Sequence, residues 1–141
     1  MLNNQTNSLL RQLLENAFNQ GAFAVVDEVL APGSVTHTAA WGVPPNREGL
    51  KRLIALFRSA FPDLQCTVED EIRSGDKLAA HWTMRGTHTG AFLGHLPTNR
   101  PFVVRAMSFA RIENGQIAEN WMLFDQMSIL QQLGIVPPAG C

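Results

Sequence analysis

The sequence contains no tyrosine and has only two cysteines among its 141 residues. Without a phenol, an acid/base site has to be built from Asp, Glu, His, Lys or Cys side chains. Cys66 and Cys141 form neither the spacing of a metal site nor a disulfide framework, and this favours a reducing, cytoplasmic location. The 11 basic residues do not outnumber the 12 acidic ones, so no nucleic-acid partner is expected.

Long apolar runs and targeting signals are also missing. No stretch of about 18 apolar residues could span a membrane, and the first residues lack the basic and apolar segments of a secretion signal. The composition, 45% hydrophobic and 16% charged, is that of a folded globular protein. At this length roughly two thirds of the unfolded surface is buried on folding. We therefore expect a single domain over residues 1–141, with its ordered core at about 6–136.

The first half of the chain has helical periodicity. An amphipathic helix is predicted by apolar residues at one-and-four spacing, namely Leu9, Leu10, Leu13, Leu14, Ala17 and Phe18. A shorter helix follows and is expected to stop at Pro32-Gly33, before an extended piece at 34–38. Asn46 is the predicted N-cap of a third helix, which Pro62 ends.

The second half alternates between apolar and polar residues, which is typical of antiparallel strands. Residues 64–73 and 77–88 predict a hairpin with a three-residue turn, Ser74-Gly75-Asp76. This register places apolar side chains opposite one another. The expected pairs are Cys66 with Met84, Val68 with Trp82, and Ile72 with Leu78.

A second hairpin is predicted around Asn114-Gly115, the dipeptide that best suits a two-residue type I′ turn. When residues are counted outward from this turn, the expected pairs are Ile112 with Ile117, Ala110 with Glu119, Ser108 with Trp121, Ala106 with Leu123, and Val104 with Asp125. One face then carries large polar groups opposite small residues, which predicts a hollow. The other face carries Met107, Phe109, Met122 and Phe124, which either helices or another subunit must cover, and we predict a homodimer through the sheet.

Several segments resemble the SnoaL-like polyketide cyclase family. They are HWTMRGTHTG at residues 81–90, FLG at 92–94, NGQI at 114–117, W-x-x-x-D from Trp121 to Asp125, and LQQLG at 130–134. The resemblance implies the α+β fold of nuclear-transport-factor-two-like proteins, a cone-shaped curved antiparallel sheet closed by N-terminal helices around a pocket. It also implies that Asp125 is a general base that removes a carbon-bound proton for an intramolecular aldol closure, with no metal or cofactor.

Asp125 has a second interpretation, because it immediately precedes a predicted short helix. Aspartate is a favoured N-cap there and would accept the backbone N–H of Met127 or Ser128. Such donors lower the pKa of a carboxyl group, whereas an apolar pocket of Val104, Trp121 and Leu123 would raise it toward neutrality. The two roles therefore make opposite demands on the same side chain.

The four histidines lack the spacing of a metal site. His88, in G-T-H-T-G on the face of Trp82, either donates to a developing enolate oxygen or hydrogen-bonds loop backbone. His37 stands where the family often has a pocket histidine and is expected to line the cavity. The other expected substrate-binding residues are Trp41, Trp82, Ser108, Glu119 and Trp121.

These residues predict an acid/base enzyme that acts on a hydrophobic, carbonyl-containing small molecule such as a polyketide-type ester. An isomerase or dehydratase of the same fold is an alternative, although such relatives commonly use pocket tyrosines, which this chain lacks. A non-catalytic small-molecule binding dimer is the third hypothesis. Replacing Asp125 by Asn is expected to separate catalysis from binding.

Overall fold

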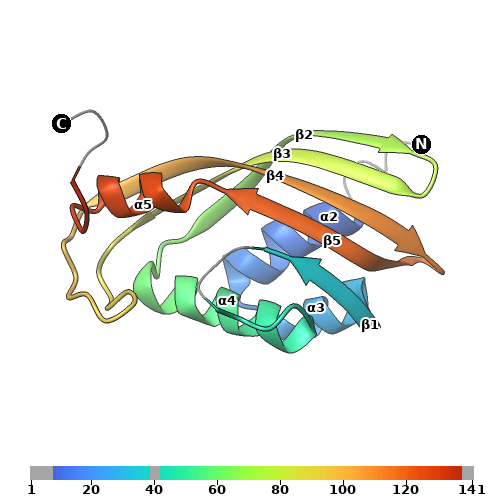
Figure 1. Cartoon of the computed structure of the whole chain (residues 1–141), viewed down its shortest axis with the longest axis horizontal. Coiled ribbons are helices and arrows are strands. Elements are labelled where there is room, and N and C mark those ends of the chain that lie inside the picture. Colours follow the sequence, from blue (N-terminus) through green and yellow to red (C-terminus); the bar gives the residue numbers. More distant parts are fainter. Residues whose placement is uncertain (1–7, 39–41, 138–141) are drawn as a thin grey trace.

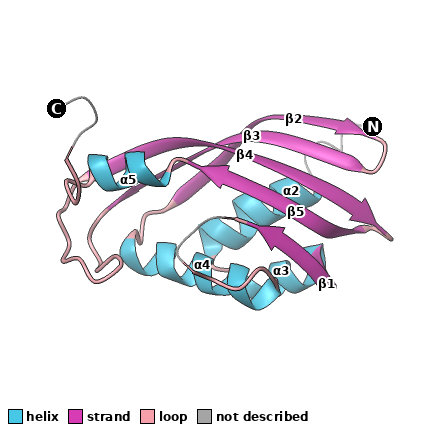
Figure 2. Ribbon diagram, in the orientation of Figure 1, coloured by secondary structure: helices cyan, strands magenta, loops and turns pink. Residues whose placement is uncertain are grey.

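The computed structural model describes residues 8–38 and 42–137, which form an α+β fold with the helices of the first half of the chain on one face of a curled, open sheet and a short last helix at the end of the sheet (Figures 1 and 2). The helices are α2 (Leu9–Arg11), η1 (Gln12–Phe18), α3 (Phe23–Val29), α4 (Arg47–Ala60) and α5 (Gln126–Gln132). The strands are β1 (Leu30–His37), β2 (Gln65–Ser74), β3 (Lys77–Thr87), β4 (Pro101–Glu113) and β5 (Gln116–Phe124). Across the described residues, the helices are too short or too polar to cross a membrane.

The sheet has the strand order β1-β5-β4-β3-β2, and β1 is parallel to β5 whereas the other pairs are antiparallel. The curved antiparallel sheet expected for the second half of the chain is confirmed, and the extended piece expected at 34–38 belongs to a strand that joins this sheet in parallel at its β5 edge. The chain leaves α3 at Val29 and enters β1 directly, so Pro32-Gly33 lie within a strand and do not end a helix. An edge strand tolerates proline because not every N–H of such a strand has a partner in the sheet.

The apolar stripe of the first helix and the start and end of the helix capped by Asn46 are confirmed. The stripe on α2 and η1 is buried against the sheet at Leu10, Leu13, Leu14, Ala17 and Phe18. Asn46 caps α4 through its side-chain oxygen, which accepts the Gly49 N–H at 2.9 Å. α4 ends at Ala60, before Pro62. These local signals sufficed because capping and amphipathic periodicity act within a few residues.

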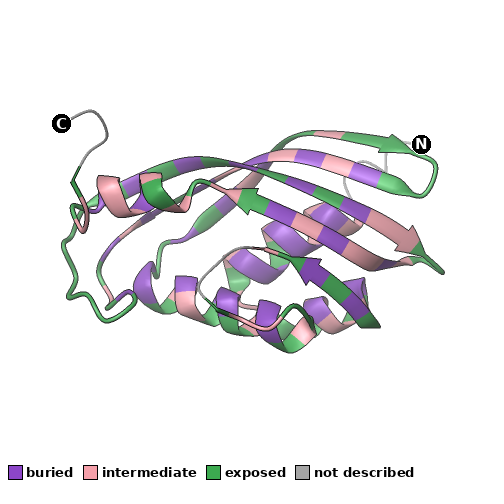
Figure 3. Cartoon of the chain, viewed as in Figure 1, coloured by how far each residue is buried: buried purple, intermediate pink, exposed green. Residues whose placement is uncertain are grey.

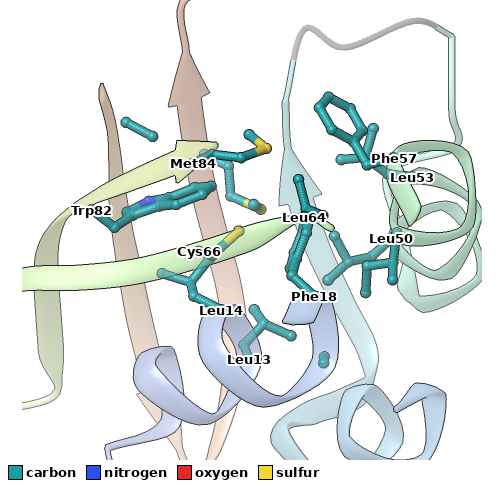
Figure 4. Close-up of a cluster of buried hydrophobic side chains, with 14 of the residues drawn as sticks. Leu13, Leu14, Phe18, Leu50, Leu53, Phe57, Leu64, Cys66, Trp82 and Met84 are labelled. Carbon is teal, nitrogen blue, oxygen red and sulfur yellow. The ribbon is translucent and has the colours of Figure 1, made fainter. Parts of the chain in front are cut away.

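The core lies between the concave face of the sheet and the helices. Trp82 and Met84 of β3 and Cys66 of β2 face side chains of η1 and α4 (Figure 4). The rings of Phe18 and Trp82 are 6.2 Å apart, and those of Phe61 and Phe102 are 4.7 Å apart. Large apolar side chains therefore occupy the central part of the concave face. Burial alternates along β3 and β4, as Figure 3 shows.

The first hairpin contains a bulge that the prediction lacked. Cys66 pairs with Met84 and Val68 with Trp82, as expected, but the register shifts between Val68 and Asp70. Ile72 consequently pairs with Ala79 and is 66% exposed. Ser74 pairs with Lys77, so the turn has two residues, and the three-residue turn and the Ile72–Leu78 pair are wrong.

The second hairpin also contains a bulge, and this one changes the candidate site. Ile112 pairs with Ile117 as predicted, but Arg111 then pairs with Glu119, which leaves Ala118 without an opposite residue. Because side chains alternate, one extra residue reverses the faces of the rest of β5. Asn120 and Met122 point into the core, whereas Glu119, Trp121 and Leu123 join the outer face. The predicted pairs beyond Ile112–Ile117 are therefore wrong.

The outer face of the sheet is partly apolar. Met107, Phe109 and Leu123 are exposed there, and Trp121 packs edge-to-face on Phe109 at 5.6 Å. Met122, which was predicted to belong to this face, is buried. An exposed apolar face is present as expected, but Leu123 and Trp121 replace Met122 and Phe124 in it.

Candidate functional site

A hollow of about 440 Å³ opens where β1 ends beside β5. It is lined by Thr36, His37, Thr38, Pro45, Trp121 and Leu123. Strand β1 stops at His37 whereas β5 continues to Phe124, so the last residues of β5 have no neighbour on that side in the sheet. The segment before α4 borders this edge, because Pro45 accepts the backbone N–H of Thr36 at 3.1 Å. The volume is in the range of small-molecule sites.

His37, Glu119 and Trp121 form the outer wall of this region. The imidazole of His37 stacks on the indole of Trp121, with centroids 5.1 Å apart and an interplanar angle of 17°. Nε2 of His37 lies 2.7 Å from Oε2 of Glu119. Arg111 reaches the other oxygen of Glu119 at 3.5 Å. The imidazole is thus oriented by a carboxylate on one side and by an aromatic ring on its face.

The electrostatics of the pair determine which nitrogen can act as a base. The hydrogen bond with His37 lowers the pKa of Glu119, and the charge of Arg111 adds to this effect. An ionised carboxylate can only accept hydrogen bonds, so Nε2 of His37 carries the proton. In the neutral ring Nδ1 therefore has the lone pair that can take up a proton.

Asp125 lies immediately after β5, and its side chain is exposed. Its Oδ1 accepts the backbone N–H of Ser128 at 2.9 Å, so Asp125 is the N-cap of α5, as the second interpretation expected. The expected apolar surroundings of this carboxylate are wrong, because β5 ends at Phe124 and Val104 lies on the inner face. Asp125 is two residues from Leu123, which lines the hollow.

His88 is buried, and its ring is held by the loop that follows β3. Nδ1 lies 3.0 Å from the Thr98 hydroxyl and accepts the Thr98 backbone N–H at 3.2 Å. Burial lowers the pKa of His88, the nearby His95 lowers it further, and the Gly90 backbone offsets part of this shift. His88 is therefore a neutral imidazole packed near Phe61, with ring centroids 5.8 Å apart.

The remaining predicted residues are separated from this hollow. Trp82 and Ser108 are buried in the core, where the indole N–H donates to the serine hydroxyl at 3.0 Å. Trp41 falls outside the described residues. Of the expected set, the structure brings together His37, Glu119 and Trp121, and it places Asp125 next along the chain.

Sequence analysis missed Thr36, Thr38 and Asn120. Alternation along the expected extended piece at 34–38 places the two threonines on one face, but no neighbouring strand was predicted for that piece. Asn120 was hidden by the bulge at Ala118.

A second hollow, of about 260 Å³, lies at the far end of β2 and contains charges of both signs, including Arg11, Asp70 and Arg73. Among residues 8–38 and 42–137, no three His, Cys, Asp or Glu side chains gather as a metal ion would require.

Comparison with known proteins adds a family to this geometry. IdmH of Streptomyces antibioticus, a proposed polyketide cyclase, is 34% identical over 89% of this chain and 96% of its own, with a TM-score of 0.77. TsrD of Streptomyces laurentii is 30% identical over 91% and 93%, with a TM-score of 0.79. A Catenulispora acidiphila protein with a ketosteroid isomerase-like fold is 18% identical over 90% and 92%, with a TM-score of 0.74, and shows the fold alone.

No curated protein sequence matches this chain. The family model described as SnoaL-like polyketide cyclase matches residues 8–133, which is most of the chain. The resemblance seen in the motifs is thereby confirmed, and the chain belongs to the SnoaL-like polyketide cyclase family.

Proposed function

We propose that this chain is a cofactor-independent acid/base enzyme that acts on a small hydrophobic carbonyl compound, most simply by intramolecular aldol closure of a polyketide-type ester. The observation that carries the proposal is the His37–Glu119 pair, stacked on Trp121 beside an open hollow in a member of this family. The hollow offers an aromatic surface for an apolar ring and an imidazole that can exchange a proton.

The proposed base is Asp125, which matches the aspartate of the family's W-x-x-x-D pattern. It removes a proton from the carbon next to a carbonyl, the resulting enolate carbon attacks a second carbonyl, and the new alkoxide takes a proton back. His37 positions a substrate oxygen and can exchange the proton through Nδ1. The position of His37 on the lining of the hollow supports this role, while Oδ1 of Asp125 accepts the Ser128 N–H and leaves Oδ2 for the substrate proton.

Proton abstraction can be measured without knowing the natural substrate. Acetylnaphthalene carries acidic methyl protons next to a carbonyl on an apolar ring, and their exchange in heavy water is followed by NMR. The intact protein is expected to accelerate this exchange. Asp125→Asn keeps a good N-cap residue but removes the base, and a rate loss of about a hundredfold or more is expected. Asp76→Asn, in the turn between β2 and β3, is the matched control and is expected to leave the rate unchanged.

The outcomes separate the candidate bases. Exchange that survives in Asp125→Asn but is lost in His37→Gln assigns the base to His37. Exchange that survives in both variants, or that the intact protein does not accelerate, rejects the acid/base proposal.

A non-catalytic binding protein is the second candidate, and one observation favours it. Among the described residues no carboxylate is buried, and Asp125 is committed to a helix cap. Retained binding of acetylnaphthalene without any accelerated exchange would support this function.

A further inference from the structure

The inner face of the β1–β5 edge carries polar side chains without hydrogen-bond partners. Asn120 is 0% exposed, and neither its Oδ1 nor its Nδ2 has a partner among the described residues. Thr36, opposite Asn120 in the sheet, is 2% exposed and its hydroxyl is likewise unpartnered. Buried amides and hydroxyls are nearly always hydrogen-bonded, because their lost hydration has to be replaced. Two adjacent exceptions on neighbouring strands require an explanation.

Part of this polar group borders the hollow described above. Thr36 and Thr38 both line it, and the hydroxyl of Thr38 is also buried without a partner. The hollow therefore has an outer wall formed by His37 and Trp121 and an inner wall of free hydroxyls. Asn120 is paired with Thr36 in the sheet and so lies next to that wall.

We propose that Asn120, Thr36 and Thr38 form a polar subsite for an uncharged substrate group that carries a hydroxyl beside a carbonyl, as in a β-hydroxy ester. A carboxamide offers one acceptor and two N–H donors on a single planar group, and each threonine hydroxyl can donate or accept. The side chains of this subsite are all uncharged, which favours a neutral ligand group over a carboxylate. This proposal rests on the proposed function in one respect, because it assumes that the ligand is a hydrophobic carbonyl compound.

Asn19 shows what a structural asparagine looks like in this protein. Its Nδ2 donates to the Cys66 carbonyl at 2.9 Å, and its Oδ1 accepts the Cys66 N–H. Both ends of that amide tie η1 to β2, so Asn19→Leu is expected to destabilise the fold. Asn120 has no such bonds, so Asn120→Leu is expected to leave stability unchanged or to raise it.

The test compares two probes on the full chain by equilibrium dialysis. One is a naphthalene that carries an ethyl β-hydroxypropanoate, and the other is butylnaphthalene, which lacks the oxygens. The intact protein is expected to bind the β-hydroxy ester about tenfold more tightly, the worth of one or two buried hydrogen bonds. In Asn120→Leu this preference is expected to fall below about twofold, with no drop in the urea midpoint.

Two further variants keep the result interpretable. Asn19→Leu is expected to lower the urea midpoint and to retain the preference. Thr36→Val keeps the shape of the side chain but removes its hydroxyl, and it is expected to reduce the preference several-fold. It serves as the test if Asn120→Leu does not fold.

The subsite is overturned by an intact protein that shows no preference or no binding up to the solubility limit. It is also overturned if a folded Asn120→Leu retains the preference, or if Thr36→Val retains it. Because dialysis measures binding alone, loss of proton exchange with the preference intact would reject the proposed reaction and leave the subsite standing. Exchange without the preference would reject only the subsite.

Discussion

The bulge at Ala118 can be tested with two adjacent residues of β5. Met122 is 1% exposed and faces the core, whereas its neighbour Leu123 is 68% exposed on the outer face. Met122→Ala removes three side-chain heavy atoms from a packed interior and leaves a cavity. The expected loss in the free energy of unfolding is about 3 kcal/mol, or roughly 9 °C in Tm. Leu123→Ala shortens a side chain that is mostly in solvent, so it leaves no cavity. It is expected to change the free energy of unfolding by less than about 0.5 kcal/mol.

The measurement is urea unfolding of both variants beside the unsubstituted chain, with the slope m compared, at one protein concentration at which sedimentation shows all three to be monomers. Without the bulge, Leu123 would face Ala106 and Met122 would lie outside, so the order of the two losses would reverse. A larger loss for Leu123→Ala, or equal losses for both, would refute the orientation of β5. Because Asn120 faces inward only in the bulged register, the same result would remove the basis of the polar subsite.

Two further predictions concern the core thiol and the outer face. Cys66 is buried, and burial raises the pKa of its thiol. In a Cys141→Ser variant, a disulfide reagent is therefore expected to react with Cys66 roughly a thousandfold more slowly in the native protein than in urea. Comparable rates would contradict this burial. The exposed apolar face at Met107 and Leu123 is expected to form a homodimer, seen by sedimentation at micromolar concentration and lost in Leu123→Glu. A monomeric unsubstituted chain would contradict the dimer.

Local signals in the sequence predicted most of the elements. The one-and-four apolar spacing, the Asn46 cap and the Asn114-Gly115 turn each act over a few residues, and the structure contains all three features. Strand pairing was predicted correctly only as far as the first irregularity in each hairpin. Beyond Val68 and beyond Ile117 the assumption of strict alternation failed.

A bulge is difficult to predict because its benefit is tertiary. Around Ala118 the sequence Ile117-Ala118-Glu119-Asn120 places two apolar residues before two polar ones, so it does not show which residue is the extra one. The bulge places Glu119 on the outer face of the sheet, where it contacts Arg111 and His37, and it turns Asn120 toward the core. His37 lies 82 residues from Glu119 in the sequence, and Arg111 meets Glu119 only once the hairpin has formed with the bulge, so nothing near Ala118 indicates these contacts. The parallel pairing of β1 with β5 was hidden for the same reason.

The distribution of charge explains why the candidate site lies at a sheet edge and not in the centre of the concave face. Among the described residues the buried polar side chains are all neutral in form: Ser34, Thr36, His88, Ser108 and Asn120. An ionised carboxylate in that interior would lose its hydration without a cation to replace it.

At the β1 edge, Glu119 keeps partial contact with water and has Arg111 and His37 as partners, so it stays ionised and orients the imidazole. A hydrophobic ligand seated on Trp121 would then exclude water from His37 only when bound. Proton transfer would thus be favoured in the complex, while the neutral side chains of Thr36 and Asn120 hold the ligand's oxygens. On this arrangement, substitution of Glu119 should impair catalysis more than binding, whereas substitution of Asn120 should do the reverse.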